Sequence, residues 1–135
     1  MSTHTIALTP RAGLLRFALT ADAAVTGVNA LAYLAGAVVL DSVLGIPAGV
    51  LVALGAFLAA YATFVGFVAT RPSPPRTGVI AVIEGNALWV AASLVLLALD
   101  TFTPSAAGQV WIAVQAVTVA GLAALQYAGL RREPR

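Results

Sequence analysis

Four long apolar runs, separated by short polar stretches, make up most of this chain. They cover residues 17–40, 47–70, 78–99 and 107–130. Because an α-helix rises about 1.5 Å per residue, each run is long enough to cross a hydrocarbon core of about 30 Å. The pattern predicts an all-α fold, a polytopic membrane four-helix bundle that forms a single domain over residues 1–135.

Polar residues inside the first run recur at helical spacing. Asp22, Thr26, Asn29 and Tyr33 stand at i, i+4, i+7 and i+11, so they share one face of a helix. Such a stripe is unfavourable against lipid tails. We therefore expect this face to point into the bundle.

Two other runs carry comparable stripes. The second has an aromatic-rich stripe of Leu54, Phe57, Tyr61, Phe64 and Val68, and the fourth has Trp111, Gln115, Thr118 and Leu122. Their spacing predicts an inward face for each of these helices.

The third run leaves two arrangements open. Glu84 and Asn86 are two residues apart and point about 200° away from each other on a helix. If Asn86 faces the axis together with Trp89 and Ser93, Glu84 faces a neighbouring helix, another subunit or the interface. If Glu84 faces the axis, Asn86 joins helices instead.

Composition and charge predict that the chain lies in a membrane and which of its ends faces the cytoplasm. Hydrophobic residues make up 61% and charged residues 9% of the chain, whereas roughly a quarter of the residues in soluble proteins are charged. All seven basic residues are arginines, at positions 11, 16, 71, 76, 131, 132 and 135, and Asp41 and Asp100 lie in the opposite loops. The positive-inside rule predicts a multi-pass protein of the inner (cytoplasmic) membrane with both termini cytoplasmic. Because topology accounts for every arginine, we expect no nucleic-acid partner.

The two halves of the chain resemble each other. Residues 29–31 recur as residues 86–88, and Pro47 recurs as Pro104 at the same offset of 57. The match predicts two parallel-repeated helical hairpins, related by an axis along the membrane normal. Small residues such as Gly55 and Ala59 would fit a homodimer seam.

Asp22 and Glu84 are the candidate catalytic residues. At about 1.5 Å per residue, Asp22 lies roughly 9 Å beyond Arg16 and Glu84 roughly 12 Å beyond Arg76, at similar depth. Desolvation favours the neutral form of a carboxyl group, which can then donate a proton. In the structural alternative Asp22 pairs with Arg16 or accepts hydrogen bonds within the bundle, and Glu84 pairs with Arg76 or reaches interfacial water.

Amide and aromatic side chains are the candidate ligand-binding groups. The expected substrate-binding residues are Asn29, Tyr33, Tyr61, Asn86, Trp89 and Gln115. Amides also join membrane helices to one another, and aromatic side chains also fill cores. The chain has no cysteine and its one histidine is His4 in the polar tail, so we expect no metal site and no cofactor.

Several segments resemble a known group of proteins. Residues 14–22, 27–33, 85–89 and 126–132 are similar to small four-helix integral membrane proteins of high-GC actinobacteria, some of them DoxX-like. More distantly, the chain resembles small membrane-bound terpene cyclases and sterol-isomerase-like bundles. The resemblance implies acid-initiated chemistry on a lipophilic substrate. The chain departs from the isomerases because it lacks an intramembrane histidine.

The sequence favours one function over two alternatives. The leading hypothesis is an intramembrane pocket for an isoprenoid-like or other lipophilic small molecule, with Asp22 as proton donor and Glu84 as second acid or base. In that pocket Tyr61 and Trp89 would stabilise a developing cation. One alternative is a dimeric, proton-coupled exporter of lipophilic cations that uses Glu84 for exchange. The other is a non-catalytic accessory protein.

Overall fold

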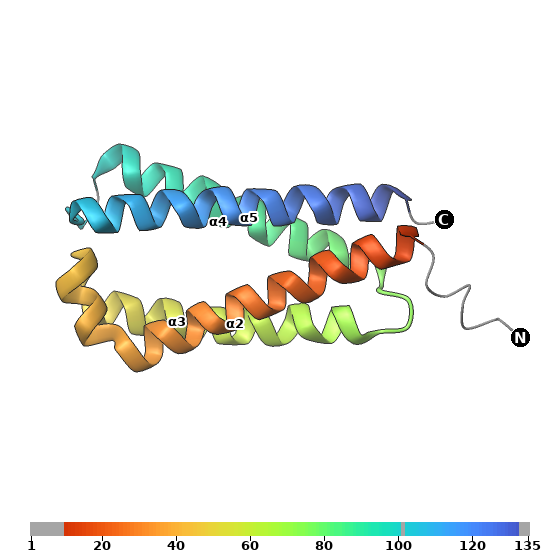
Figure 1. The fold of residues 1–135 in the computed structure, drawn as a ribbon, viewed down its shortest axis with the longest axis horizontal. Helices are drawn as coiled ribbons and strands as arrows, with labels where there is room; N and C mark the ends of the chain where they lie inside the picture. Colours follow the sequence, from red (N-terminus) through yellow and green to blue (C-terminus); the bar gives the residue numbers. More distant parts are fainter. Residues whose placement is uncertain (1–9, 101, 133–135) are drawn as a thin grey trace, which may run out of the picture.

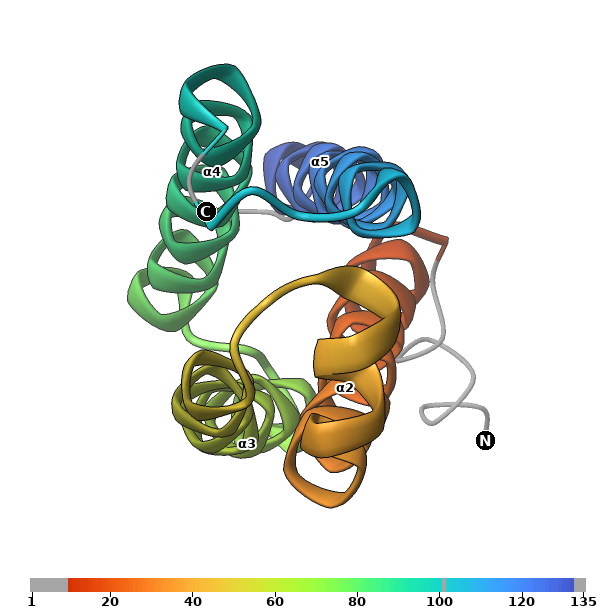
Figure 2. The ribbon, with the colours of Figure 1, turned by 90° about the vertical axis from the view of Figure 1, so that its left-hand side faces the viewer.

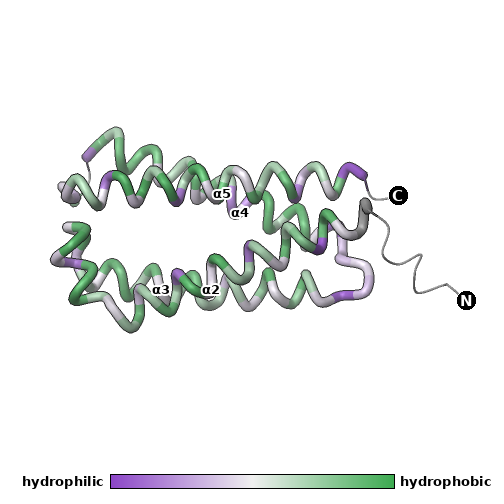
Figure 3. Tube along the Cα trace, in the orientation of Figure 1, coloured by the Kyte–Doolittle hydropathy of each residue, from purple (hydrophilic) through white to green (hydrophobic). Residues whose placement is uncertain are grey.

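The computed structural model describes residues 10–100 and 102–132, which form four helices. These are α2 (Pro10–Leu44), α3 (Ala48–Thr70), α4 (Arg76–Leu99) and α5 (Ala106–Arg132). Each contains a segment long and apolar enough to cross a membrane, and hydrophobic residues dominate all four (Figure 3). The prediction of an all-α bundle of four helices, each long and apolar enough to span a membrane, is confirmed.

The helices form two antiparallel hairpins, α2–α3 and α4–α5 (Figure 1). α2 packs along α3 and α5, and α4 packs along α5. The side chains of α3 and α4 pack together near the α3–α4 connection, and the two helices diverge toward the opposite end (Figure 2). The start of α2, the α3–α4 connection and the end of α5 lie together at one end, which we call the arginine end (Figure 1). The opposite end holds the α2–α3 and α4–α5 connections, and we call it the aspartate end.

α2 is longer than predicted because it continues past a kink at Gly36, where the backbone leaves helical geometry. The part after the kink turns toward the start of α5 (Figure 1). There the Ser105 N–H donates to the Leu44 carbonyl at 2.9 Å, and the Ser105 hydroxyl donates to the Val43 carbonyl at 2.7 Å. Gly108 permits this approach, because a Cβ at that position would overlap the Leu44 carbonyl oxygen.

Asp41 lies inside α2 and not in a loop, which corrects the sequence prediction. Its Oδ2 accepts a hydrogen bond from the Ala48 N–H at 2.9 Å. The first N–H groups of a helix lack partners within the helix, so this carboxylate satisfies one of them at the start of α3.

Arg16 holds α2 against the end of α3. Its guanidinium donates to the carbonyls of Ala69, Arg71 and Pro72, where the last carbonyls of α3 lack helical partners. On the neighbouring helix, Gly129 lets α5 approach α2, because a Cβ there would lie 2.8 Å from the Leu15 Cα. The arginine end is therefore tightly closed.

The predicted stripes differ in how well they describe the inward faces. The stripe of α2 is confirmed: Asp22, Thr26 and Tyr33 are buried and Asn29 is half-buried. The aromatic stripe of α3 is wrong in part, because Phe57 and Phe64 are 55% and 41% exposed. In α5, Gln115 and Leu122 are buried, but Thr118 is exposed.

Gly55 of α3 lies at the contact between α3 and α2. A Cβ at this position would lie 2.8 Å from the Leu34 side chain, so the missing side chain allows α2 and α3 to pack closely. The small residue that would fit a homodimer seam thus faces α2.

Candidate functional site

A buried hydrogen-bond network surrounds the Asp22 carboxylate. The Thr26 hydroxyl donates to Oδ1 at 3.0 Å. The Asn86 and Gln126 side-chain amides each donate to Oδ2 at 2.7 Å. The network thus connects α2, α4 and α5 through one carboxyl group that is 1% exposed.

Tyr61 extends this network to α3. Its hydroxyl lies 2.8 Å from the Val82 carbonyl oxygen and 3.1 Å from Asn86 Oδ1, and its single hydrogen serves these two acceptors. Asn86 also donates to Gln126 Oε1 at 3.0 Å. All four helices therefore meet in what we call the Asp22 network: Asp22, Thr26, Tyr61, Asn86 and Gln126.

The partners of Asp22 are neutral donors. An ionised carboxylate only accepts hydrogen bonds, so the Thr26, Asn86 and Gln126 donors suit that form. Arg16, the cation that the sequence offered as a partner, is engaged at the end of α3. The geometry corresponds to the structural alternative in which Asp22 accepts hydrogen bonds within the bundle.

Thr26 and Gln126 are the members of this network that sequence reasoning missed as site residues. Thr26 at least lay in the predicted stripe of α2, whereas Gln126 lay in no predicted stripe. It is completely buried and follows Gln115 and Leu122 at i+11 and i+4, so it continues the inward face of α5. At about 1.5 Å per residue it lies roughly 7.5 Å from Arg131, close to the depth of Asp22. That shared depth was the signal that could have identified it.

Glu84 does not meet Asp22. Asn86 is buried in the network and Glu84 is exposed on α4, which decides between the two arrangements left open by the sequence. The two residues point in opposite directions because they are two positions apart on one helix. The two acids therefore do not lie in one pocket, as the leading hypothesis would require.

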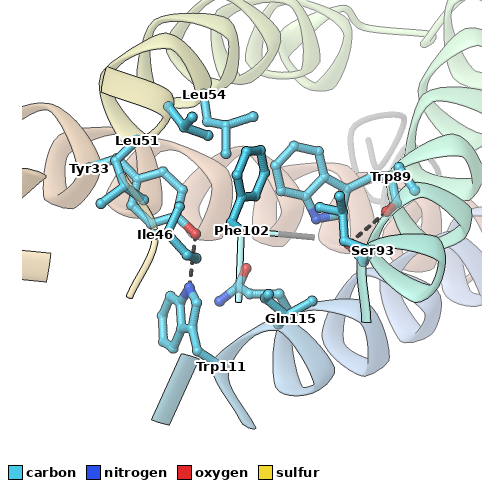
Figure 4. Close-up of a pocket in the computed structure, with 13 residues that line it drawn as sticks. Tyr33, Ile46, Leu51, Leu54, Trp89, Ser93, Phe102, Trp111 and Gln115 are labelled. Atoms are coloured by element: carbon cyan, nitrogen blue, oxygen red, sulfur yellow. Dashed lines mark hydrogen bonds between the residues drawn. The ribbon is translucent and has the colours of Figure 1, made fainter. Parts of the chain in front are cut away.

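An apolar cavity lies between the hairpins, in the half of the bundle nearer the aspartate end (Figure 4). Its volume is about 120 Å³. It is lined by Tyr33, Ile46, Val50, Leu51, Leu54, Trp89, Ala92, Ser93, Leu96, Phe102, Trp111, Ile112 and Gln115. We call it the outer cavity.

A smaller cavity adjoins it closer to the Asp22 network. This inner cavity has a volume of about 30 Å³ and includes Thr26, Asn29, Tyr61 and Asn86 in its lining. Trp89 and Gln115 line both cavities, so the two spaces are neighbours.

Hydrogen bonds fix the polar side chains of these walls. The Trp111 indole N–H donates to the Tyr33 hydroxyl at 2.8 Å, and Asn29 Nδ2 donates to Gln115 Oε1 at 2.8 Å. Both bonds join α2 to α5. They hold aromatic and amide groups in place around an apolar space.

The six substrate-binding candidates all line these cavities. Tyr33, Trp89 and Gln115 line the outer cavity, and Asn29, Tyr61, Asn86, Trp89 and Gln115 line the inner one. Asp22 lines neither, because its carboxyl lies behind Thr26 and Asn86. The expectation that Asp22, Tyr61 and Trp89 line one cavity therefore holds for the two aromatic residues and is wrong for Asp22.

The chain was compared with protein families, curated proteins and solved structures. None of them matches it.

Proposed function

We propose that this membrane protein binds a lipophilic small molecule in the outer cavity, with the inner cavity receiving one end of it. The observation that carries the proposal is an apolar space of about 120 Å³ walled by Trp89 and Trp111 and adjoining buried amides. An apolar cavity of about 150 Å³ holds a benzene molecule in another protein, so the outer cavity suits one ring of a ligand. The rest of a larger ligand would extend into the inner cavity or between α3 and α4. Binding sites are commonly apolar pockets with a few placed polar groups.

Access from the bilayer fits the same proposal. α3 and α4 diverge toward the aspartate end (Figure 2), and the outer cavity is lined by Val50 and Leu54 from α3 and by Ala92 and Leu96 from α4. A lipophilic molecule dissolved in the membrane would enter between these two helices. Such a ligand need not pass through water.

Tryptophan fluorescence tests the proposal, because the only two tryptophans of the chain, Trp89 and Trp111, both line the outer cavity. We expect 2-acetylnaphthalene to quench their emission saturably, by energy transfer, when it is added to the protein in nanodiscs. Probe dissolved in the bilayer quenches in proportion to its concentration. Quenching without a saturable component would contradict binding.

The acid-initiated chemistry expected from the sequence stays a prediction, and the geometry restricts its route. A proton from Asp22 could reach a ligand only through groups that separate the carboxyl from the inner cavity. Thr26 is such a residue, because its hydroxyl donates to Asp22 and the residue is part of the lining of that cavity. In such a step a protonated Asp22 would give its proton to the Thr26 hydroxyl, which would pass its own hydrogen to the ligand, and the donors around Asp22 would stabilise the carboxylate that is left. A proton lost from the ligand in the final step would return to Asp22 along the same path.

The exporter hypothesis gave Glu84 the role of exchange carboxylate. Glu84 is exposed on α4 and lines neither cavity. Within one chain it does not contact the proposed binding site, so that role would require a second copy of the protein. Binding by a single bundle is the proposal that the geometry favours.

We also propose that the arginine end faces the cytoplasm, in accordance with the positive-inside rule. The chain has no cysteine, so single cysteines can be introduced at two exposed positions, Ser73 at the arginine end and Ala106 at the aspartate end. In intact cells, a membrane-impermeant maleimide should label the Ala106→Cys variant and should label Ser73→Cys only after permeabilisation. The opposite pattern would reverse the orientation.

A further inference from the structure

The polar atoms of the outer cavity include hydrogen-bond donors that the protein itself does not use. Gln115 is 9% exposed, and its Oε1 accepts the hydrogen bond from Asn29. Its Nε2 amino group makes no hydrogen bond within residues 10–100 and 102–132. The side-chain amides of Asn29 and Gln115 carry four N–H groups between them. The single hydrogen bond that joins them uses one of these groups in either orientation of the amides, so the other three are left to donate elsewhere.

Tyr33 offers a second unused donor in the same wall. It is 4% exposed, and its hydroxyl oxygen accepts the Trp111 indole N–H. The hydroxyl hydrogen has no acceptor in the part of the chain that the structure describes. Figure 4 shows the Gln115 amide beside the hydrogen-bonded pair of Tyr33 and Trp111, and Gln115 follows Trp111 by one helical turn.

Buried donors are normally satisfied, because leaving one without a partner is costly. Gln115 and Tyr33 place unused donors on neighbouring side chains of a largely apolar wall, and the Trp89 indole N–H, which makes no hydrogen bond within the described residues, is a third in the same cavity. These donors create a demand for an acceptor. A lipid chain cannot meet this demand, since it carries no acceptor at that depth.

We infer that the cavity recognises a lipophilic molecule that carries a carbonyl oxygen, with the Gln115 amide and the Tyr33 hydroxyl donating to that oxygen. This inference rests on the proposed function and names the class of its ligand. The apolar part of the molecule lies against Trp89, Leu54 and Leu96 in the outer cavity. A carbonyl oxygen accepts two hydrogen bonds, so both donors can bind it at once.

A matched pair of probes tests this inference. 2-Acetylnaphthalene carries a carbonyl group, and 2-ethylnaphthalene has a similar shape without it. The affinity of the acetyl probe is measured by the saturable quenching of tryptophan emission in nanodiscs. The ethyl probe absorbs at too short a wavelength to accept energy from tryptophan, so its affinity is measured by competition, as the recovery of tryptophan emission when it displaces the acetyl probe. Both affinities are expressed per probe concentration in the bilayer. The wild-type protein should prefer the acetyl probe by about tenfold, as expected when one or two neutral hydrogen bonds form.

Two variants test whether the preference for the acetyl probe depends on the Gln115 amide and the Tyr33 hydroxyl. Gln115→Leu removes the amide, and Tyr33→Phe removes only the hydroxyl, so each should lower the ratio of the two affinities. Gln109→Leu is the matched control, because Gln109 is an exposed amide on the same helix that does not line the cavity. This control should keep the wild-type ratio. Tyr33→Phe also provides a milder test in case Gln115→Leu folds poorly.

The possible outcomes separate this inference from the proposed function. Equal binding of both probes by the wild-type protein would overturn carbonyl recognition and leave the lipophilic site intact. Saturable binding of neither probe would overturn the proposed function itself. A tenfold preference that persists in both Gln115→Leu and Tyr33→Phe would show that other groups recognise the oxygen.

Discussion

Replacing Asp22 with leucine is expected to destabilise the bundle strongly, whereas replacing it with asparagine is expected to change stability little. Leucine would remove the acceptor of the Thr26 hydroxyl and of one N–H group each of Asn86 and Gln126. Only the Asn86–Gln126 bond and the longer bond from Gln126 to the Ala18 carbonyl would remain. Hydrogen bonds between membrane helices average about 0.6 kcal/mol, and an unsatisfied buried group costs about 1–3 kcal/mol. With three donors affected, we expect a loss of at least about 2 kcal/mol.

Asparagine can preserve the same network. Its carbonyl oxygen can accept the Asn86 and Gln126 amides in place of Oδ2, and its amino group can donate to the Thr26 hydroxyl oxygen. We therefore expect a change below about 1 kcal/mol. Both variants are measured by reversible unfolding of the purified protein in detergent micelles with increasing denaturant.

Glu84→Leu is the matched control for this pair. Glu84 is the other acid inside an apolar run, but it is exposed on α4. An apolar side chain in that position should leave the free energy of unfolding unchanged or raise it, because the outer surface of the bundle faces lipid. Wild-type stability in Asp22→Leu would show that the network does not hold the helices together. Equal losses in Asp22→Leu and Asp22→Asn would show that the charge itself is required.

Filling the outer cavity is expected to abolish ligand binding. The double variant Ala92→Phe with Leu96→Phe adds two aromatic rings to the α4 wall of a space of about 120 Å³. The added side chains should occupy the volume that a ligand needs, so the saturable quenching by 2-acetylnaphthalene should disappear. The titration is the tryptophan quenching measurement in nanodiscs, since both tryptophans are retained.

The matched control shifts the same substitutions by one position. Ala91 and Val95 precede the filled positions, are exposed, and do not line either cavity. Ala91→Phe with Val95→Phe adds the same side chains to the lipid-facing side of α4. This control should bind the probe with wild-type affinity.

Polar residues revealed more of the fold than apolar residues did. The stripe from Asp22 to Tyr33 was correct because a carboxyl and amides are strongly disfavoured in lipid and have to face the interior. Phe57 and Phe64 were assigned inward by spacing alone, yet both are exposed. Lipid tails are as apolar as a protein core, so the spacing of apolar residues in a membrane helix does not identify its inward face.

The site itself could be predicted only in outline. The six ligand-binding candidates do line the cavities, because polar and aromatic groups at mid-membrane depth must be enclosed. The place of Asp22 behind Thr26 and Asn86 depends on how α4 and α5 are rotated against α2, and helical periodicity does not contain that information. The same rotation leaves Glu84 outside, which the sequence left open.

The cavity follows from packing that no local pattern encodes. Gly129 brings α5 close to α2 at the arginine end. Toward the other end α3 and α4 diverge, and the kinked part of α2 contacts the start of α5. These contacts join residues far apart in the chain, so the space between the hairpins could not be anticipated from the runs themselves.

The most direct test of the central claim compares two titrations with 2-acetylnaphthalene in nanodiscs. The first uses the cavity-filling variant Ala92→Phe with Leu96→Phe. The second uses its control, Ala91→Phe with Val95→Phe. If a lipophilic molecule binds between α3 and α4, saturable quenching is absent from the first titration and is the same as in the wild-type protein in the second. Equal saturable quenching in both titrations would contradict the claim, because it would place the bound molecule outside the cavity.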